Sequence, residues 1–185
     1  MPLADSSAVL RCFMDRKPEL DWVWKDLWKA VDDLYRCDVD LFKNNVSERC
    51  LASTLVKHLW NQTRNNGIYL NLSVQWDGEY NRHGPSLDPK IIDGHCRTPD
   101  LVLHERGTDA QNLCVIEVKK HHARSFDNRS PNNQSKDIKV LEAMTAPEGA
   151  FRYRSGLLLI LNPRKIEMLS FPERTWHSFA PPPQS

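Results

Sequence analysis

The sequence contains no apolar run long enough to cross a membrane and no cysteine spacing typical of a zinc or redox site. Nowhere do about 18 consecutive apolar residues occur, and the N-terminus shows no apolar stretch behind a basic start. The five cysteines are odd in number and include no Cys-x-x-Cys pair, which argues against a disulfide framework and against a cysteine-rich zinc site. We therefore expect a cytoplasmic protein without a membrane partner.

The sequence also lacks an excess of charge of either sign. Lys and Arg together number 25, against 24 for Asp and Glu, so the whole chain carries no general basic signature of nucleic-acid binding. Any such binding must depend on a local patch. With 185 residues, 40% of them hydrophobic and 26% charged, one globular domain with a sizeable core is expected.

Amphipathic patterns predict an α/β fold with a central mixed β-sheet flanked by helices. Residues 20–41 and 44–60 carry apolar side chains at helical spacing, and Asn44, Asn45 or Ser47 is suited to cap the second helix. The further predicted elements are a strand at 68–76, an irregular connection at 77–95, a β-hairpin of strands 99–105 and 112–120, a loop at 121–135, a helix at 135–149 and a buried strand at 156–163.

This order divides the chain into three segments. Residues 1–45 are expected to form an added N-terminal helical segment that packs on the core. Residues 46–170 hold the predicted sheet and its helices, and residues 171–185 are expected to be a flexible C-terminal tail. No internal repeat and no second domain are evident.

The predicted hairpin brings three charged side chains together. Glu117 and Lys119 interrupt an otherwise apolar strand and share one of its faces, because strand residues alternate with period two. Asp100 opens the partner strand, so antiparallel pairing places it near both. Two neighbouring carboxylates suit Mg²⁺ or Mn²⁺, and Lys119 would orient an attacking water or offset charge on a phosphate. The simpler alternative is a solvated ion pair at a strand end.

Glu48 adds a third carboxylate to this set. It lies three and seven residues before Leu51 and Leu55, which places it on the inward face of its helix. A buried charge needs a partner, and the predicted metal site would supply one. Alternatively, with Asn45 as the N-cap, Glu48 would close a capping box at the third helical position.

These residues resemble a known motif. Pro99-Asp100 and Glu117-Val118-Lys119, separated by a hairpin, are similar to the PD-(D/E)XK motif of the restriction-endonuclease-like nuclease superfamily. The segment around Glu48 resembles the first core helix of that superfamily with its acidic residue, and residues 137–141 and 156–161 resemble its later helix and strand. The resemblance extends from about Val46 to Leu161.

The resemblance implies a restriction-endonuclease-like core at 46–170 and a metal-dependent nuclease activity. By this resemblance Asp100 and Glu117 bind Mg²⁺ or Mn²⁺, the main-chain carbonyl of Val118 is a further ligand, Lys119 positions the nucleophilic water and Glu48 assists at the metal. Hydrolysis of the phosphodiester bond would be direct, without a covalent enzyme intermediate. The implied partner is nucleic acid, with DNA favoured over RNA.

A local basic segment follows the second hairpin strand and continues into the next predicted helix. It can contact phosphates or be a solvated loop, and its composition does not separate the two. The candidate nucleic-acid-binding residues are Lys120, His121, His122, Arg124, Arg129, Lys136 and Lys139.

Two other functions remain open at the level of the sequence. One is a non-catalytic module of the same fold that docks nucleic acid or protein through Trp22, Trp24 and Trp28 or through the basic segment. The other is a nuclease subunit active only as a homodimer or in a larger complex. A zinc site is disfavoured, because the spacing of His83, His95, Cys96 and His104 matches no standard ligand pattern.

Overall fold

A computed structural model describes residues 18–120 and 131–181 as an α/β fold around one mixed six-stranded sheet. The sheet order is β1-β6-β7-β8-β9-β10, in which β7 and β8 are parallel and all other neighbours are antiparallel. Its strands are β1 (Gln75–Gly78), β6 (Leu101–His104), β7 (Asn112–Lys120), β8 (Ser155–Asn162), β9 (Lys165–Phe171) and β10 (Thr175–Phe179). The predicted mixed sheet is confirmed.

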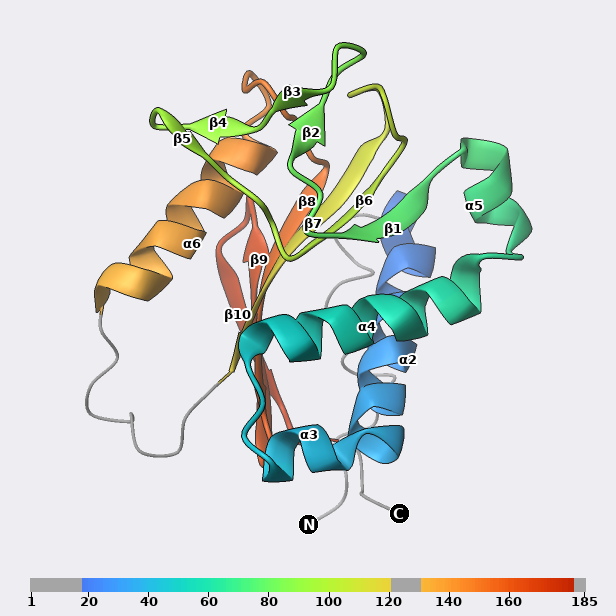
Figure 1. The fold of residues 1–185 in the computed structure, drawn as a ribbon, viewed down its shortest axis with the longest axis vertical. Coiled ribbons are helices and arrows are strands. Elements are labelled where there is room, and N and C mark those ends of the chain that lie inside the picture. The colour runs from blue at the N-terminus through green and yellow to red at the C-terminus, as the bar shows by residue number, and fades with distance from the viewer. Residues whose placement is uncertain (1–17, 121–130, 182–185) are drawn as a thin grey trace.

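Helices cover both faces of the sheet (Figure 1). Helices α2 and α4 pack on one face, and helix α6 packs on the other. The helices are η1 (Pro18–Leu20), α2 (Asp21–Cys37), α3 (Val39–Lys43), α4 (Glu48–Thr63), α5 (Gly67–Leu72) and α6 (Pro131–Thr145). The helix expected at 20–41 is therefore interrupted at Asp38, and the helix expected from 135 begins at 131.

The alternation of side chains along β7 determines where the charged residues lie. Ile116 and Val118 are buried against the α2 and α4 side, whereas Val115 is buried in the cluster that includes Leu141 of α6. Because strand residues alternate between faces, Glu117 joins Val115 on the α6 side. Lys119 lies two residues further along β7, so it shares this face with Glu117, as the sequence predicts.

The prediction of a strand at 68–76 is wrong for most of these residues. Residues Gly67–Leu72 form α5, and only the end of the stretch enters β1. The Asn66 side chain accepts a hydrogen bond from the Ile68 N–H at 3.0 Å and so begins a helix. Tyr69 is buried and donates its hydroxyl to Asp26 at 2.8 Å, while Ile68 and Leu70 are exposed. The alternation of apolar residues in 68–72 therefore belongs to a short helix and not to a strand with one buried face.

The expectation of a flexible tail from residue 171 is also wrong over part of its range. The chain reverses after Phe171 and forms β10, which pairs with β9 over five residue pairs. β10 is an edge strand in which Trp176 and Ser178 are exposed and Thr175, His177 and Phe179 are half-buried. Because β10 contains no fully buried residue, its sequence carries a weak strand signal, and β10 was not predicted. β9 was not predicted either, although Ile166, Met168, Leu169 and Phe171 are buried in it. Residues 182–185 lie outside the described part of the chain.

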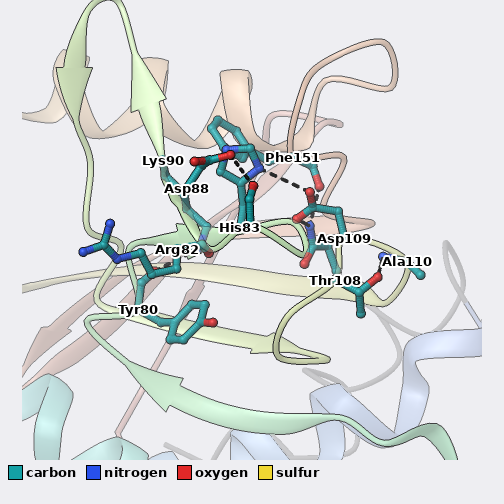
Figure 2. Close-up of polar contacts among 11 residues, drawn as sticks. Tyr80, Arg82, His83, Asp88, Lys90, Thr108, Asp109, Ala110 and Phe151 are labelled. Atoms are coloured by element: carbon teal, nitrogen blue, oxygen red, sulfur yellow. Dashed lines mark hydrogen bonds and ion pairs between the residues drawn. The ribbon is translucent and has the colours of Figure 1, made fainter.

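The connection between β1 and β6 contains two short ribbons. One pairs β2 (Arg82–His83) with β3 (Asp88–Pro89), and the other pairs β4 (Ile91–Ile92) with β5 (His95–Cys96). Figure 2 shows His83 pointing toward Asp109, with His83 Nδ1 3.2 Å from Asp109 Oδ2 and the imidazole edge-on to the ring of Phe151. These contacts fix the first ribbon to the sheet.

Lys90 holds the two ribbons together. Its side chain is 1% exposed, and its ammonium donates to the main-chain carbonyls of Tyr80, at 3.0 Å, and Arg82. Burial lowers the pKa of Lys90 to about 8. The main-chain carbonyl of Lys90 in turn accepts the N–H of Arg97 at 2.7 Å. The connection predicted to be irregular is thus an ordered unit that leads into the start of β6.

Candidate functional site

A carboxylate site lies where β7 continues past the end of its neighbour β6. The β6–β7 ladder ends at the pair Leu101 and Ile116, whereas β7 runs on to Lys120. Beyond that point the Val118 N–H donates to Asp100 Oδ2 at 2.7 Å. A side-chain carboxylate therefore accepts a main-chain hydrogen bond that a strand partner would otherwise accept.

Two further contacts hold this open edge of β7. The N–H of Lys120 donates to Glu48 Oε1 at 3.1 Å, which brings the first residue of α4 to the end of the strand. The main-chain carbonyl of Asp100 accepts the Glu79 N–H at 3.0 Å on its other side. Asp100 is thus held through both its main chain and its side chain.

Asp100, which is half-buried, and Glu117, which is buried, form a carboxyl pair. Glu117 is 8% exposed, and its carboxyl group shares a side-chain hydrogen bond with that of Asp100. Burial, together with the charges of Asp100 and Asp137, raises the pKa of Glu117 to about 9. Burial also raises the pKa of Asp100, although the Val118 N–H and the Lys119 charge act in the opposite direction. At neutral pH the pair therefore holds a proton, and a bound cation can take the place of that proton.

Lys119 lies between two other carboxylates. Its Nζ is 3.5 Å from Glu48 Oε2 and 3.3 Å from Asp137 Oδ2, a residue of α6. Burial lowers the pKa of Lys119, but Asp137, Glu48 and Glu117 outweigh burial and raise that pKa above its usual value. The ammonium therefore stays charged in a fixed position beside the carboxyl pair.

The main chain supplies another oxygen to the same edge. In a β-strand the N–H and the C=O of one residue point to the same side of the strand. Because the Val118 N–H faces Asp100 beyond the end of β6, the Val118 carbonyl lies on that open edge as well. Two carboxyl groups and one carbonyl are the hard oxygen donors that Mg²⁺ and Mn²⁺ accept, with water completing the coordination. Across residues 18–120 and 131–181, no three His, Cys, Asp or Glu side chains are grouped closely enough to hold a metal by themselves.

Glu48 lies at the site but is not buried as expected. Its side chain is 42% exposed, because it is the first residue of α4 and reaches past the helix end toward β7. The capping box with Asn45 is wrong. Ser47 is the N-cap, and its Oγ accepts the Cys50 N–H at 3.3 Å.

The predicted nucleic-acid-binding residues divide into two groups. Lys120 donates to the Asn45 side chain and to the main-chain carbonyl of Val46 at 2.8 Å, so its ammonium is bound within the chain. Lys136 and Lys139 are exposed on α6. The remaining candidates, His121, His122, Arg124 and Arg129, lie outside the described residues.

The histidines and tryptophans that were considered for binding lie elsewhere. His104 is buried and contacts Asp77 at 3.0 Å, in a network separate from His83. The docking role considered for the tryptophans is not supported for Trp24, which is 5% exposed. Trp22 and Trp28 are partly buried against the same core.

Asp137 belongs to the site although it was not predicted as a site residue. The sequence does contain a signal for Asp137, which is its spacing along the helix. Asp137 lies three residues before Val140 and four before Leu141, and both of these are buried on the inward face of α6. An inward carboxylate on a helix needs a partner. The same reasoning that identified Glu48 would have identified Asp137.

No protein-family model matches the chain, and comparison with curated proteins and with solved structures returned no match either. Among the helices of the described part of the chain, none is both long and apolar enough to cross a membrane. The function is therefore argued from the geometry of the site.

Proposed function

We propose that this protein hydrolyses phosphodiester bonds of nucleic acid, with DNA favoured over RNA, in a reaction that depends on Mg²⁺ or Mn²⁺. The observation that carries the proposal is the carboxyl pair of half-buried Asp100 and buried Glu117, which lies beside Lys119 at the open edge of β7. Four carboxylates, those of Glu48, Asp100, Glu117 and Asp137, interact electrostatically around this one ammonium. Such an excess of negative charge favours a divalent cation.

The residues present fit that cation. Asp100, Glu117 and the Val118 carbonyl would hold it, and Glu48 lies close enough to the edge to assist. When bound, the metal ion would lower the pKa of a water and offset negative charge on the phosphate. The raised pKa of Glu117 agrees with a group that exchanges a proton for a metal ion.

The chain's own groups then account for the remaining chemistry. Lys119 is held by Glu48 and Asp137, so its ammonium is oriented without rearrangement and can direct the attacking water or neutralise charge on the phosphate. The water oxygen forms the new bond to phosphorus as the bond from phosphorus to the leaving oxygen breaks. The attacking water releases a proton to solvent, and the leaving oxygen takes a proton from solvent. No side chain needs to form a covalent intermediate.

The order of the elements supports the same proposal. Helix α4 is followed by the antiparallel strands β1, β6 and β7, then by α6 and by β8, which is parallel to β7. The acidic residue of α4 and the pairs Pro99-Asp100 and Glu117-Lys119 lie in this order as the resemblance to the restriction-endonuclease-like superfamily requires. A restriction-endonuclease-like core is therefore part of the proposal.

A second candidate is a non-catalytic binding module of the same fold, or a subunit that needs a partner. The ion pairs of Lys119 with Glu48 and Asp137 favour this candidate, because they compensate the charge of Lys119 without a metal ion. In a binding module, Mg²⁺ should leave the melting temperature unchanged. Size-exclusion chromatography with and without DNA tests for a homodimer or a larger assembly.

The test is cleavage of supercoiled plasmid, linear DNA and RNA by the purified protein in Mg²⁺, in Mn²⁺ and in EDTA. The variants are Asp100→Asn, Glu117→Gln and Lys119→Met, with Glu105→Gln at the other end of the hairpin as the matched control. We expect the control to cleave like the wild type and each site variant to be slower by at least about 100-fold. Equal rates for the wild type and the site variants would show that this site is not catalytic.

A further inference from the structure

Within residues 18–120 and 131–181, three cations near the carboxylate site are already engaged by acceptors of the chain. Lys119 is bound by two carboxylates, and Lys120 by a side-chain amide oxygen and a main-chain carbonyl. The guanidinium of Arg49 lies 2.6 Å from the carboxylate of Glu79. A polyanion entering this site would meet several carboxylates, and each of these three cations is already paired within the chain.

Arg97 differs from these cations. Its Nε is buried and has no hydrogen-bond partner in the structure. It lies three residues before Asp100, and its charge lowers the pKa of Asp137, on which Lys119 also acts. The guanidinium therefore lies within electrostatic reach of the carboxylate site.

The position of Arg97 is fixed by its main chain. The Arg97 N–H donates to the Lys90 carbonyl at 2.7 Å, and Lys90 ties together the two ribbons before β6. Pro99, which is buried, restricts the chain between Arg97 and Asp100. Arg97 is thus attached to the same rigid segment that positions Asp100.

A buried guanidinium N–H without an acceptor is costly, and native proteins rarely leave one unexplained. The planar donor fork of arginine matches the oxygens of a phosphate better than the single point charge of lysine does. We propose that Arg97 binds a backbone phosphate of the nucleic acid at the carboxylate site. This inference rests on the proposed function and names the residue that overcomes the repulsion between the substrate and the site.

The test compares Arg97→Met, which keeps the buried stem and removes the donors, with Arg97→Ala and with the wild-type residue. Arg82→Met is the matched control, because Arg82 is an exposed arginine of the same connection. Affinity for a fluorescein-labelled DNA duplex is measured by anisotropy in Mg²⁺ over a range of salt concentrations. All proteins carry Glu117→Gln so that the duplex stays intact, and their melting temperatures are recorded.

We expect Arg97→Met to weaken the affinity for the DNA duplex about tenfold, because one charge-assisted hydrogen bond is lost. The melting temperature should not change. The slope of log K against log salt should fall by about 0.9, the value for one phosphate contact. In the background with Glu117 intact, the same variant should raise KM for DNA more than it lowers kcat. Affinity and slope equal to those of Arg82→Met would overturn the inference.

The remaining outcomes separate the inference from the proposed function. If the wild type binds DNA without cleaving it and Arg97→Met still weakens binding, the nuclease activity is wrong and the phosphate contact stands. If the wild type cleaves DNA and Arg97→Met binds as the control does, the nuclease stands and the contact is wrong. If the protein binds no nucleic acid at all, both are wrong.

Discussion

The Asp100 carboxylate accepts the Val118 N–H at 2.7 Å, so it takes the place of a strand partner where β6 has ended. This single contact explains why the site lies where it does. β7 is longer than its neighbour, and the edge that it exposes gathers Asp100, Glu48 and the Val118 carbonyl. Glu117 and Lys119 reach the same place from the α6 face of the sheet.

Replacing Asp137 with Asn should slow cleavage without abolishing it. The substitution keeps the shape of the side chain but removes one of the two carboxylates that hold the Lys119 ammonium. A misplaced ammonium should lower kcat about tenfold to 100-fold, whereas KM should change little. Steady-state kinetics on linear DNA gives both constants. Glu142→Gln on the same helix is the control, and an unchanged kcat for Asp137→Asn would contradict a positioning role.

The stability of the metal-free protein should fall as the pH rises from about 4.5 to about 9. In the unfolded chain Glu117 ionises near its usual pKa of 4.5, whereas burial and the neighbouring Asp100 raise its folded pKa to about 9. Between pH 4.5 and pH 9, Glu117 is protonated in the folded state and ionised in the unfolded state. Its contribution to the free energy of unfolding is therefore complete below pH 4.5 and is lost as the pH rises to about 9.

Urea unfolding in EDTA at a series of pH values measures this effect. The slope due to one proton is at most about 1.4 kcal/mol per pH unit. Glu117→Gln should flatten the profile, and the control Glu105→Gln should not. Parallel profiles for the wild type and Glu117→Gln would show that Glu117 does not hold the proton.

Asp77→Asn should destabilise the fold at neutral pH by about 2 kcal/mol. Asp77 is buried at the β1–β6 pair and accepts hydrogen bonds from His104 at 3.0 Å and Arg106 at 2.7 Å. Burial alone would raise the pKa of Asp77, but these bonds hold it well below its usual range. The lowered pKa means that this stability is present above pH 3.8 and is lost at lower pH.

Chemical denaturation at pH 7 compares Asp77→Asn with Asp93→Asn, whose side chain is exposed in the β4–β5 turn. The control should unfold like the wild type. Equal unfolding free energies for all three proteins would remove the argument that this buried network stabilises the sheet.

Gly156→Ala should cost about 1–3 kcal/mol, because it overpacks the contact of α6 with β8. A Cβ at this position would lie 2.8 Å from Thr145 Cγ2 and 3.2 Å from Phe171 Cβ. Gly67→Ala is the matched control, since a Cβ there would meet nothing within 4 Å. Thermal unfolding should show a loss for the first variant only. Equal melting temperatures would mean that the sheet and α6 shift to make room.

The core of the site could be predicted because its residues are close in the sequence. Asp100, Glu117 and Lys119 lie on one hairpin, and strand periodicity with antiparallel pairing is enough to place them together. Glu48 comes from another element. Its helical spacing from Leu51 and Leu55 predicted an inward position, where a carboxylate needs a partner. That spacing did not predict that the side chain would remain 42% exposed at the end of α4.

Other features depend on contacts that no local pattern reveals. α5 forms because Asn66 caps it and because Tyr69 is buried against Asp26, which lies on a helix distant in the sequence. The position of Arg97 depends on Lys90 and on the folding of the whole β1–β6 connection. The helical spacing of Asp137 could have predicted that its side chain faces inward. Its position beside Lys119 is seen only in the structure.

The proposed hydrolysis of nucleic acid requires that Asp100 and Glu117 bind a divalent cation. The most direct measurement is diffraction from a crystal of the protein soaked in Mn²⁺, with anomalous scattering used to locate the ion. We expect an anomalous peak in contact with one carboxylate oxygen each of Asp100 and Glu117 and with the Val118 carbonyl. A crystal without such a peak, in which the two carboxyl groups still hydrogen-bond to each other, would show that this pair does not bind the metal ion.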